Sequence, residues 1–122
     1  MNVDEIIDYC LNKKSAYIDY PFGVIPICLK VHNKIFAQVY PNVTDYKITL
    51  KCEPMFGDFY RQIYQNSVVR GYHCPPVQQP YWNTIYMNGD VSDDVLKLMI
   101  DHAYKIVVSK LPKNIQKEFS DS

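Results

Sequence analysis

The stretch YKITLKC, residues 46–52, alternates apolar and polar side chains from end to end. Ile48 and Leu50 point to one side of an extended chain and Lys47 and Lys51 to the other, because successive side chains of a strand lie on opposite faces. A strand of this kind is half buried and is typical of an antiparallel sheet with one packed and one exposed face. The stretch therefore predicts such a sheet, with lysines on its exposed face.

Helices and further strands are predicted before and after this stretch. Asn2 and Glu5 have the spacing of a capping box, and Ser92 caps a long final helix that Pro112 stops. A tight turn at residues 32–33 joins two of the strands. The predicted elements are a helix over 3–13, strands over 27–31, 35–40 and 46–52, a helix over 54–64, strands over 68–74 and 83–87, and a helix over 93–110.

This α-β-β-β-α-β-β-α order predicts one α+β domain over residues 1–122, a length that suits a single domain. The sheet is expected to be antiparallel, with the helices packed on one of its faces. Residues 113–122 are polar and are expected to form a frayed tail.

Composition limits the classes of function. The formal net charge is zero, which argues against a strongly basic nucleic-acid-binding protein. Residues 26–73 nevertheless carry six basic and three acidic side chains, which indicate either a modest basic face or the ordinary solvated side of a sheet. The four cysteines form no Cys-x-x-Cys pair and suggest free thiols in a cytoplasmic protein. The longest apolar run, residues 24–29, is too short to span a bilayer.

Residues 71–85, GYHCPPVQQPYWNTI, form the most unusual segment and place His73 next to Cys74. If residues 68–74 form a strand, these two side chains face opposite ways and cannot act as a nucleophile and its base. The chain also has no glycine-rich phosphate loop and no spacing of zinc ligands. The sequence therefore predicts a protein that is not an enzyme and has no cofactor or metal.

Aromatic side chains are abundant: eleven tyrosines, five phenylalanines and a single tryptophan, Trp82. Aromatic rings beside lysines can stack nucleic-acid bases while the cations hold phosphates. Tyrosine also packs well on a half-buried sheet, and packing is the favoured interpretation.

Gly71-Tyr72-His73, followed downstream by Trp82-Asn83-Thr84-Ile85, resembles the MmcQ/YjbR family. The resemblance covers the chain from about residue 2 to residue 113. Segments that agree with the family in order are residues 5–6, 9–11, 20–23, 30–31, 34–37, 48–54, 101–104, 107–108 and 110–112.

The resemblance implies an α-β(3)-α-β(2)-α fold shared in outline with secretion chaperones. It also implies binding of double-stranded DNA through a double-wing arrangement. The chain departs from the family pattern at residues 74–81. This segment is longer than the family's basic stretch and contains no lysine, arginine or second histidine.

The leading hypothesis is a DNA-binding protein that contacts phosphates from one basic sheet face. A protein-interaction module that uses the exposed sheet face and loop 74–81 is the alternative, and a small-molecule pocket beneath residues 75–80 is a third hypothesis. No membrane partner is expected, and the oligomeric state is left open. The candidate nucleic-acid-binding residues are Lys30, Lys34, Lys47 and Lys51 on or beside the face, and Arg70, His73, Tyr81, Trp82 and Asn83 at its edge.

Overall fold

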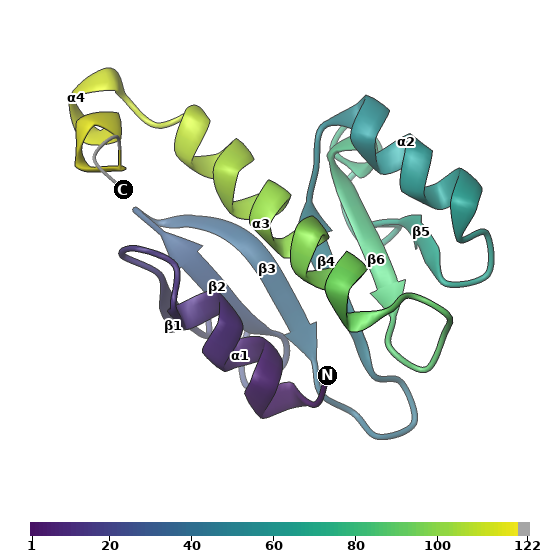
Figure 1. The fold of residues 1–122 in the computed structure, drawn as a ribbon. Coiled ribbons are helices and arrows are strands. Elements are labelled where there is room, and N and C mark those ends of the chain that lie inside the picture. Colours follow the sequence, from purple (N-terminus) through teal and green to yellow (C-terminus); the bar gives the residue numbers. More distant parts are fainter. Residues whose placement is uncertain (120–122) are drawn as a thin grey trace.

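Six antiparallel strands form one sheet in the order β1-β2-β3-β4-β6-β5 (Figure 1). The structure, a computed structural model, describes residues 1–119. The strands are β1 (Tyr17–Asp19), β2 (Ile27–Val31), β3 (Lys34–Tyr40), β4 (Lys47–Lys51), β5 (Val68–Arg70) and β6 (Trp82–Tyr86).

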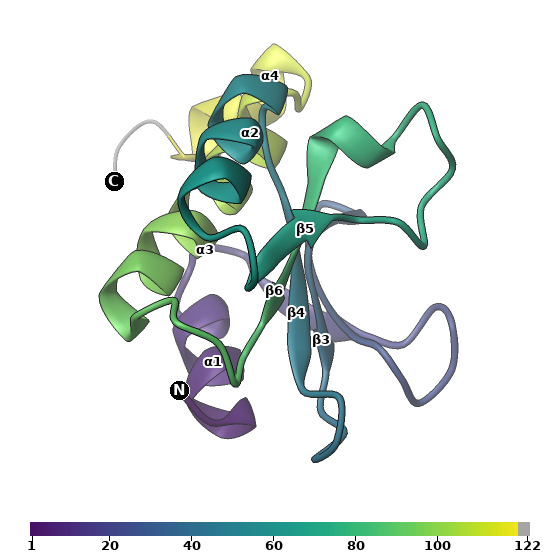
Figure 2. The ribbon, with the colours of Figure 1, turned by 90° about the vertical axis from the view of Figure 1, so that its right-hand side faces the viewer.

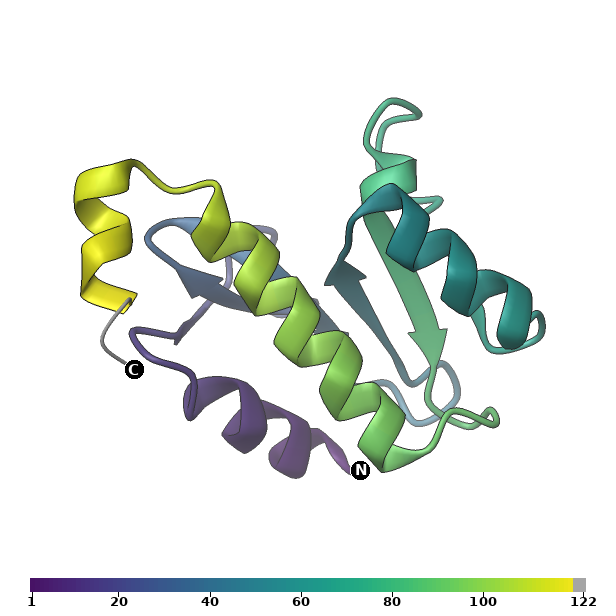
Figure 3. The ribbon, with the colours of Figure 1, turned by 45° about the horizontal axis from the view of Figure 1, so that its top comes forward.

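Three helices cover one face of this sheet: α1 (Val3–Leu11), α2 (Pro54–Ile63) and α3 (Asp93–Ser109). Figure 2 shows them on the same side of the strands, and Figure 3 shows α3 crossing between α1 and α2. The hydrophobic core lies between the two layers, and Ile48 and Leu50 of the YKITLKC stretch are buried in it. The predicted α+β class, with helices on one face of an antiparallel sheet, is confirmed.

The hairpin between β2 and β3 sets the position of several side chains used below. His32 and Asn33 have φ angles of 47° and 64°, so the predicted tight turn is confirmed. The pairing shifts by one residue beside Lys30. Because of this irregularity Ile35 pairs with Lys30, and the two consecutive residues Phe36 and Ala37 both lie in the core.

The face opposite the helices is only partly exposed. A row of paired residues crosses it, and Gln38, Thr49 and Thr84 in this row are buried. The hydroxyls of Thr49 and Thr84 lie 2.9 Å apart, and the Nε2 atom of His73 lies 3.2 Å from the side-chain oxygen of Gln38. Two loops, residues 20–26 and 71–78, project from this side (Figure 2). The face predicted to be open is therefore closed at its centre.

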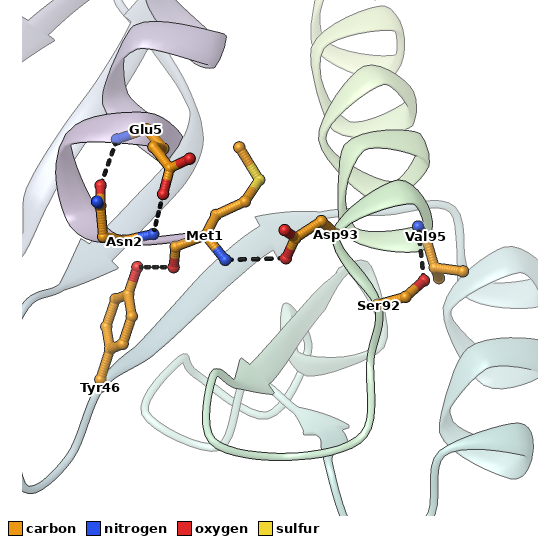
Figure 4. Close-up of polar contacts among 7 residues, drawn as sticks. All are labelled: Met1, Asn2, Glu5, Tyr46, Ser92, Asp93 and Val95. Atoms are coloured by element: carbon orange, nitrogen blue, oxygen red, sulfur yellow. Dashed lines mark hydrogen bonds and ion pairs between the residues drawn. The ribbon is translucent and has the colours of Figure 1, made fainter.

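The N-terminus is fastened to both α1 and α3 (Figure 4). Asn2 and Glu5 form the predicted capping box at the start of α1. The amino group of Met1 lies 2.8 Å from the carboxylate of Asp93, in the first turn of α3, and the carbonyl of Met1 accepts a hydrogen bond from the Tyr46 hydroxyl. These contacts join the first helix, the last helix and Tyr46, the residue before β4.

The structure differs from the sequence predictions at three places. The edge strand β1 was not expected, because three residues are too few to show alternation. The strand predicted over 68–74 ends at Arg70, since the backbone turns at residues 71–74. The predicted frayed tail instead forms α4 (Lys113–Gln116) and η2 (Lys117–Phe119), and only residues 120–122 lie outside the described part of the chain.

The C-terminal turn is held by polar contacts with α3. The side-chain amide of Gln116 donates to the carbonyl oxygens of Ser109 and Leu111, at 2.9 and 2.6 Å. These bonds satisfy carbonyl groups that the end of a helix leaves without partners. The helices within residues 1–119 are all too short or too polar to span a bilayer.

Candidate nucleic-acid interface

The register of the sheet places three of the predicted lysines on one face. Lys47 and Lys51 lie two residues either side of Thr49, which is aligned through Gln38 with Cys28 of β2. Because side chains alternate, Lys30, two residues after Cys28, shares that face. The register that the sequence left open therefore brings Lys30, Lys47 and Lys51 to the side away from the helices.

Two of these lysines are paired with acids. The Nζ atom of Lys30 lies 2.7 Å from an oxygen of Asp19, and this hydrogen bond raises the pKa of Lys30. The Nζ atom of Lys47 lies 2.7 Å from Asp45 and 5.2 Å from the ring of Tyr40. A phosphate would have to compete with a carboxylate at both positions.

Lys51 has aromatic neighbours instead. Its Nζ atom lies 5.0 Å from the ring centroid of Trp82, its partner across the β4–β6 pairing, and 5.5 Å from that of Tyr81. Lys110, at the end of α3, lies 5.8 Å from the Tyr81 ring. Burial lowers the pKa of Lys51, and the nearby positive charges of Lys110 and Lys34 lower it further.

We call Lys34, Lys51 and Lys110 the lysine cluster. Among the ion pairs of residues 1–119, none joins a member of the cluster to a carboxylate. The three side chains come from the β2–β3 hairpin, the end of β4 and the end of α3. Their mutual repulsion makes the cluster a place where an anion is favoured.

The cluster surrounds a surface cavity of about 440 Å³. This cavity lies beside Trp82 rather than beneath residues 75–80, where a small-molecule pocket was predicted. Its lining residues are Asn33, Lys34, Ile35, Lys51, Trp82, Val107, Lys110 and Leu111.

Arg70 and Asn83 do not belong to this surface. Asn83 is paired with Arg70 and is only 5 % exposed. Its amide nitrogen donates to the carbonyl of Gly57 at 3.0 Å, and its amide oxygen accepts from Arg61, so the side chain anchors α2. Arg70 follows the core residue Val68 by two positions and shares the helix-covered face. Asn83 and Arg70, which were predicted to lie at the edge of the exposed face, therefore lie on the opposite side of the sheet.

His73 and Cys74 lie closer together than the sequence predicted. The Sγ atom of Cys74 lies 3.7 Å from the Nε2 atom of His73, because both residues belong to a turn and not to a strand. Burial raises the pKa of the Cys74 thiol, and burial together with Lys47 lowers the pKa of His73. A nucleophilic cysteine needs a lowered pKa, so this contact does not favour a thiolate.

His73 also packs edge-to-face on Tyr40, with ring centroids 5.9 Å apart, and bonds Gln38. Its position at the centre of the face suits a structural role, in which it fixes loop 71–78 over the sheet. No group of three potential metal-ligating side chains occurs within the described 1–119 segment.

Sequence reasoning missed the contribution of Lys110. In the sequence, Lys110 is already explained by its position at the end of a predicted helix, because the negative end of the helix dipole stabilises cations there. Only the path of α3 over the sheet brings it within 5.8 Å of Tyr81. The aromatic pair Tyr81-Trp82 beside a predicted lysine strand was the available signal for this region.

A family model described as YjbR matches residues 11–106. The chain belongs to the YjbR family. Among its relatives, the "Uncharacterized protein YjbR" of Escherichia coli K12 is 26% identical over 117 residues and matches 96% of each chain. The "Uncharacterized protein YbdF" of Escherichia coli O157:H7 is 30% identical over 98 residues, 80% of this chain and 77% of the relative.

Solved structures share the YjbR-family fold. A crystal structure of a Deinococcus radiodurans protein has a TM-score of 0.86 and 24% identity, over 96% of this chain and 86% of the other. A crystal structure of a Pseudomonas syringae protein has a TM-score of 0.68 and 20% identity, over 87% of this chain and 98% of the other. At these identities the likeness establishes the fold alone.

Proposed function

We propose that this YjbR-family protein is a non-enzymatic DNA-binding protein that contacts phosphates through the lysine cluster. The observation that carries the proposal is a set of three lysines that have no carboxylate partner among residues 1–119 and lie next to the rings of Tyr81 and Trp82. Cations hold phosphates without regard to sequence, and adjacent aromatic rings offer surfaces for bases.

The sequence predicted DNA contacts across the sheet face, whereas the proposal places the phosphate contacts at one end of the sheet. Lys30 and Lys47 contribute less because Asp19 and Asp45 neutralise them. Burial is the main cause of the lowered pKa of Lys51, and the positive charges of Lys110 and Lys34 lower it further. An approaching phosphate would offset this repulsion, which gives the cluster a physical preference for anions. The proposal also places the protein in the cytoplasm, since its four cysteines are free thiols.

A salt titration tests the proposal. A fluorescent duplex is titrated with the protein at ionic strengths from low to physiological, and the affinity is expected to fall with a log–log slope of about −3 for three phosphate contacts. Lys51→Gln/Lys110→Gln is expected to reduce this slope. The matched control is Lys97→Gln/Lys105→Gln, which removes the same charge from α3 away from the cavity. Absence of binding at low salt, or an affinity that does not change with salt, would contradict the proposal.

A protein-interaction module is the second candidate. Two loops on the same side of the sheet expose apolar side chains: Val24 is 84 % and Val77 is 77 % exposed. Exposed apolar groups on one side of a molecule can form an interaction surface. This candidate predicts that nuclease-treated protein retains a partner, and that Val24→Ser/Val77→Ser releases it while Lys51→Gln does not. Loss of the partner on nuclease treatment would contradict it.

A further inference from the structure

We infer that the cavity inside the lysine cluster holds one unpaired nucleotide, with its base on the apolar floor and its phosphate at the lysines. The inference rests on the proposed function and specifies which part of a nucleic acid the site takes. It follows from the combination of floor, rim and size in one cavity.

The floor of the cavity is apolar. Val107 and Leu111 are each 6 % exposed, and Ile35 and Trp82 complete this part of the lining. A phosphate by itself gains nothing from such a floor, because burial of apolar surface stabilises only apolar or aromatic groups. The ligand therefore needs a flat or apolar body as well as a negative charge.

The rim of the cavity is cationic. Lys34, Lys51 and Lys110 reach it from three different elements, and Asn33 is the other polar residue of the lining. None of the described residues that line it is acidic. The ammonium of Lys51 lies 5.0 Å from the Trp82 ring, so a cation and an aromatic surface lie next to each other. A nucleotide presents the complementary pair, a phosphate and a planar base, on one unit.

The size of the cavity selects an unpaired nucleotide. About 440 Å³ lies within the range of roughly 300–1,000 Å³ that small-ligand sites span. A base inside a duplex is stacked and paired on all sides, so it would meet only the lysines of the rim. A base in a single strand, or a free mononucleotide, can reach the floor because its ring faces are not covered.

Trp82 allows a direct test, because it is the single tryptophan of the chain and lines the cavity. Wild-type protein is titrated with three probes at one salt concentration: an oligothymidylate, a strand of the same length made of abasic sites, and a blunt duplex. The expected result is quenching of Trp82 by the oligothymidylate and an affinity about tenfold higher than for the abasic strand. Thymidine monophosphate, added alone, shows whether a free nucleotide is sufficient to produce the quenching.

Two variants assign the effect to the two parts of the site. Ile35→Ser is expected to remove the preference for oligothymidylate over the abasic strand and to keep the binding of the abasic strand. Lys51→Gln is expected to weaken the binding of both strands about equally. Thermal melts confirm that each variant is folded.

The outcomes separate this inference from the proposed function. Equal affinity for the oligothymidylate and the abasic strand, with unchanged Trp82 fluorescence, overturns the nucleotide site and leaves phosphate binding intact. Failure of every probe to bind overturns both. Quenching by thymidine monophosphate as strong as that by the strand supports the site and identifies its ligand as a free nucleotide.

Discussion

Two groups of lysines differ in their surroundings: the pair Lys30 and Lys47 on the face of the sheet away from the helices, and the lysine cluster at the end of the sheet. Lys30 and Lys47 each lie 2.7 Å from a carboxylate oxygen. The lysine cluster has no such partner among residues 1–119 and shares the rings of Tyr81 and Trp82. A count of charges along the sequence treats both groups alike. The comparison shows that the availability of a cation depends on the acids that the fold brings to it.

Removing charge from one group at a time gives the largest expected difference. Lys51→Gln/Lys110→Gln should lower the affinity for DNA about tenfold or more and reduce the salt slope by about 2, because two phosphate contacts are lost. Lys30→Gln/Lys47→Gln removes the same charge and should cost less than about threefold, because those cations are already neutralised. Fluorescence anisotropy at low salt measures both. Equal losses would remove the distinction between the two groups.

Releasing the paired lysines should make the two groups more alike. Asp19→Asn/Asp45→Asn frees Lys30 and Lys47 and should raise the affinity for DNA by about threefold, since two cations become available. Asp4→Asn/Asp8→Asn, on α1, adds the same net charge away from this face and serves as the control. An equal rise in both variants would mean that only net charge matters.

Removing a lysine should have opposite effects on the free energy of unfolding in the two groups. Lys51→Met removes a cation whose pKa is lowered by burial and by two neighbouring lysines, and should raise the free energy of unfolding by less than about 1 kcal/mol, since water screens a half-exposed charge. Lys30→Met removes the partner of Asp19 and should lower it slightly. Urea denaturation of both variants checks the signs. A lower free energy of unfolding in Lys51→Met would show that repulsion between the lysines of the cluster does not destabilise the folded protein.

The smallest effect concerns His73, which contacts the face between the two groups. Burial and Lys47 lower its pKa, so the unfolded chain takes up this proton at a higher pH than the folded chain does. The free energy of unfolding should therefore fall as the pH drops below about 6.5, by less than about 1 kcal/mol from this residue. The His73→Gln variant should show a shallower fall in urea denaturation between about pH 7 and pH 5.5. Identical pH profiles would contradict the lowered pKa.

The alternation within residues 46–52 was sufficient to place Lys47 and Lys51, because period-two alternation is a local property of the strand. The shared face with Lys30 could not be predicted, since it depends on the register between strands. Asn83 was misplaced even though a local signal existed. Ile85 is a core residue two positions later, and it places Asn83 on the helix-covered face.

The remaining errors involve segments held by distant contacts. Gly71 still donates a backbone bond to Trp82 of β6, and bonds from Tyr72 to Arg70 and from Cys74 to Gly71 then turn the chain, so the strand predicted over 68–74 extended too far. The turns after Pro112 depend on Gln116, which bonds the end of α3. The cavity is formed by a hairpin, two strands and a helix terminus that are far apart in the sequence. No local sequence pattern could therefore predict it.

The two outermost strands of the sheet have a consequence for aggregation. β1 and β5 contain three residues each and form its edges. Asp19 and Arg70 place a charge on each edge, and the chain turns away after Arg70. Short charged edges give a second molecule few free backbone groups with which to continue the sheet. We therefore expect copies of this protein to resist edge-to-edge pairing at high concentration, even though the sheet is not closed into a barrel.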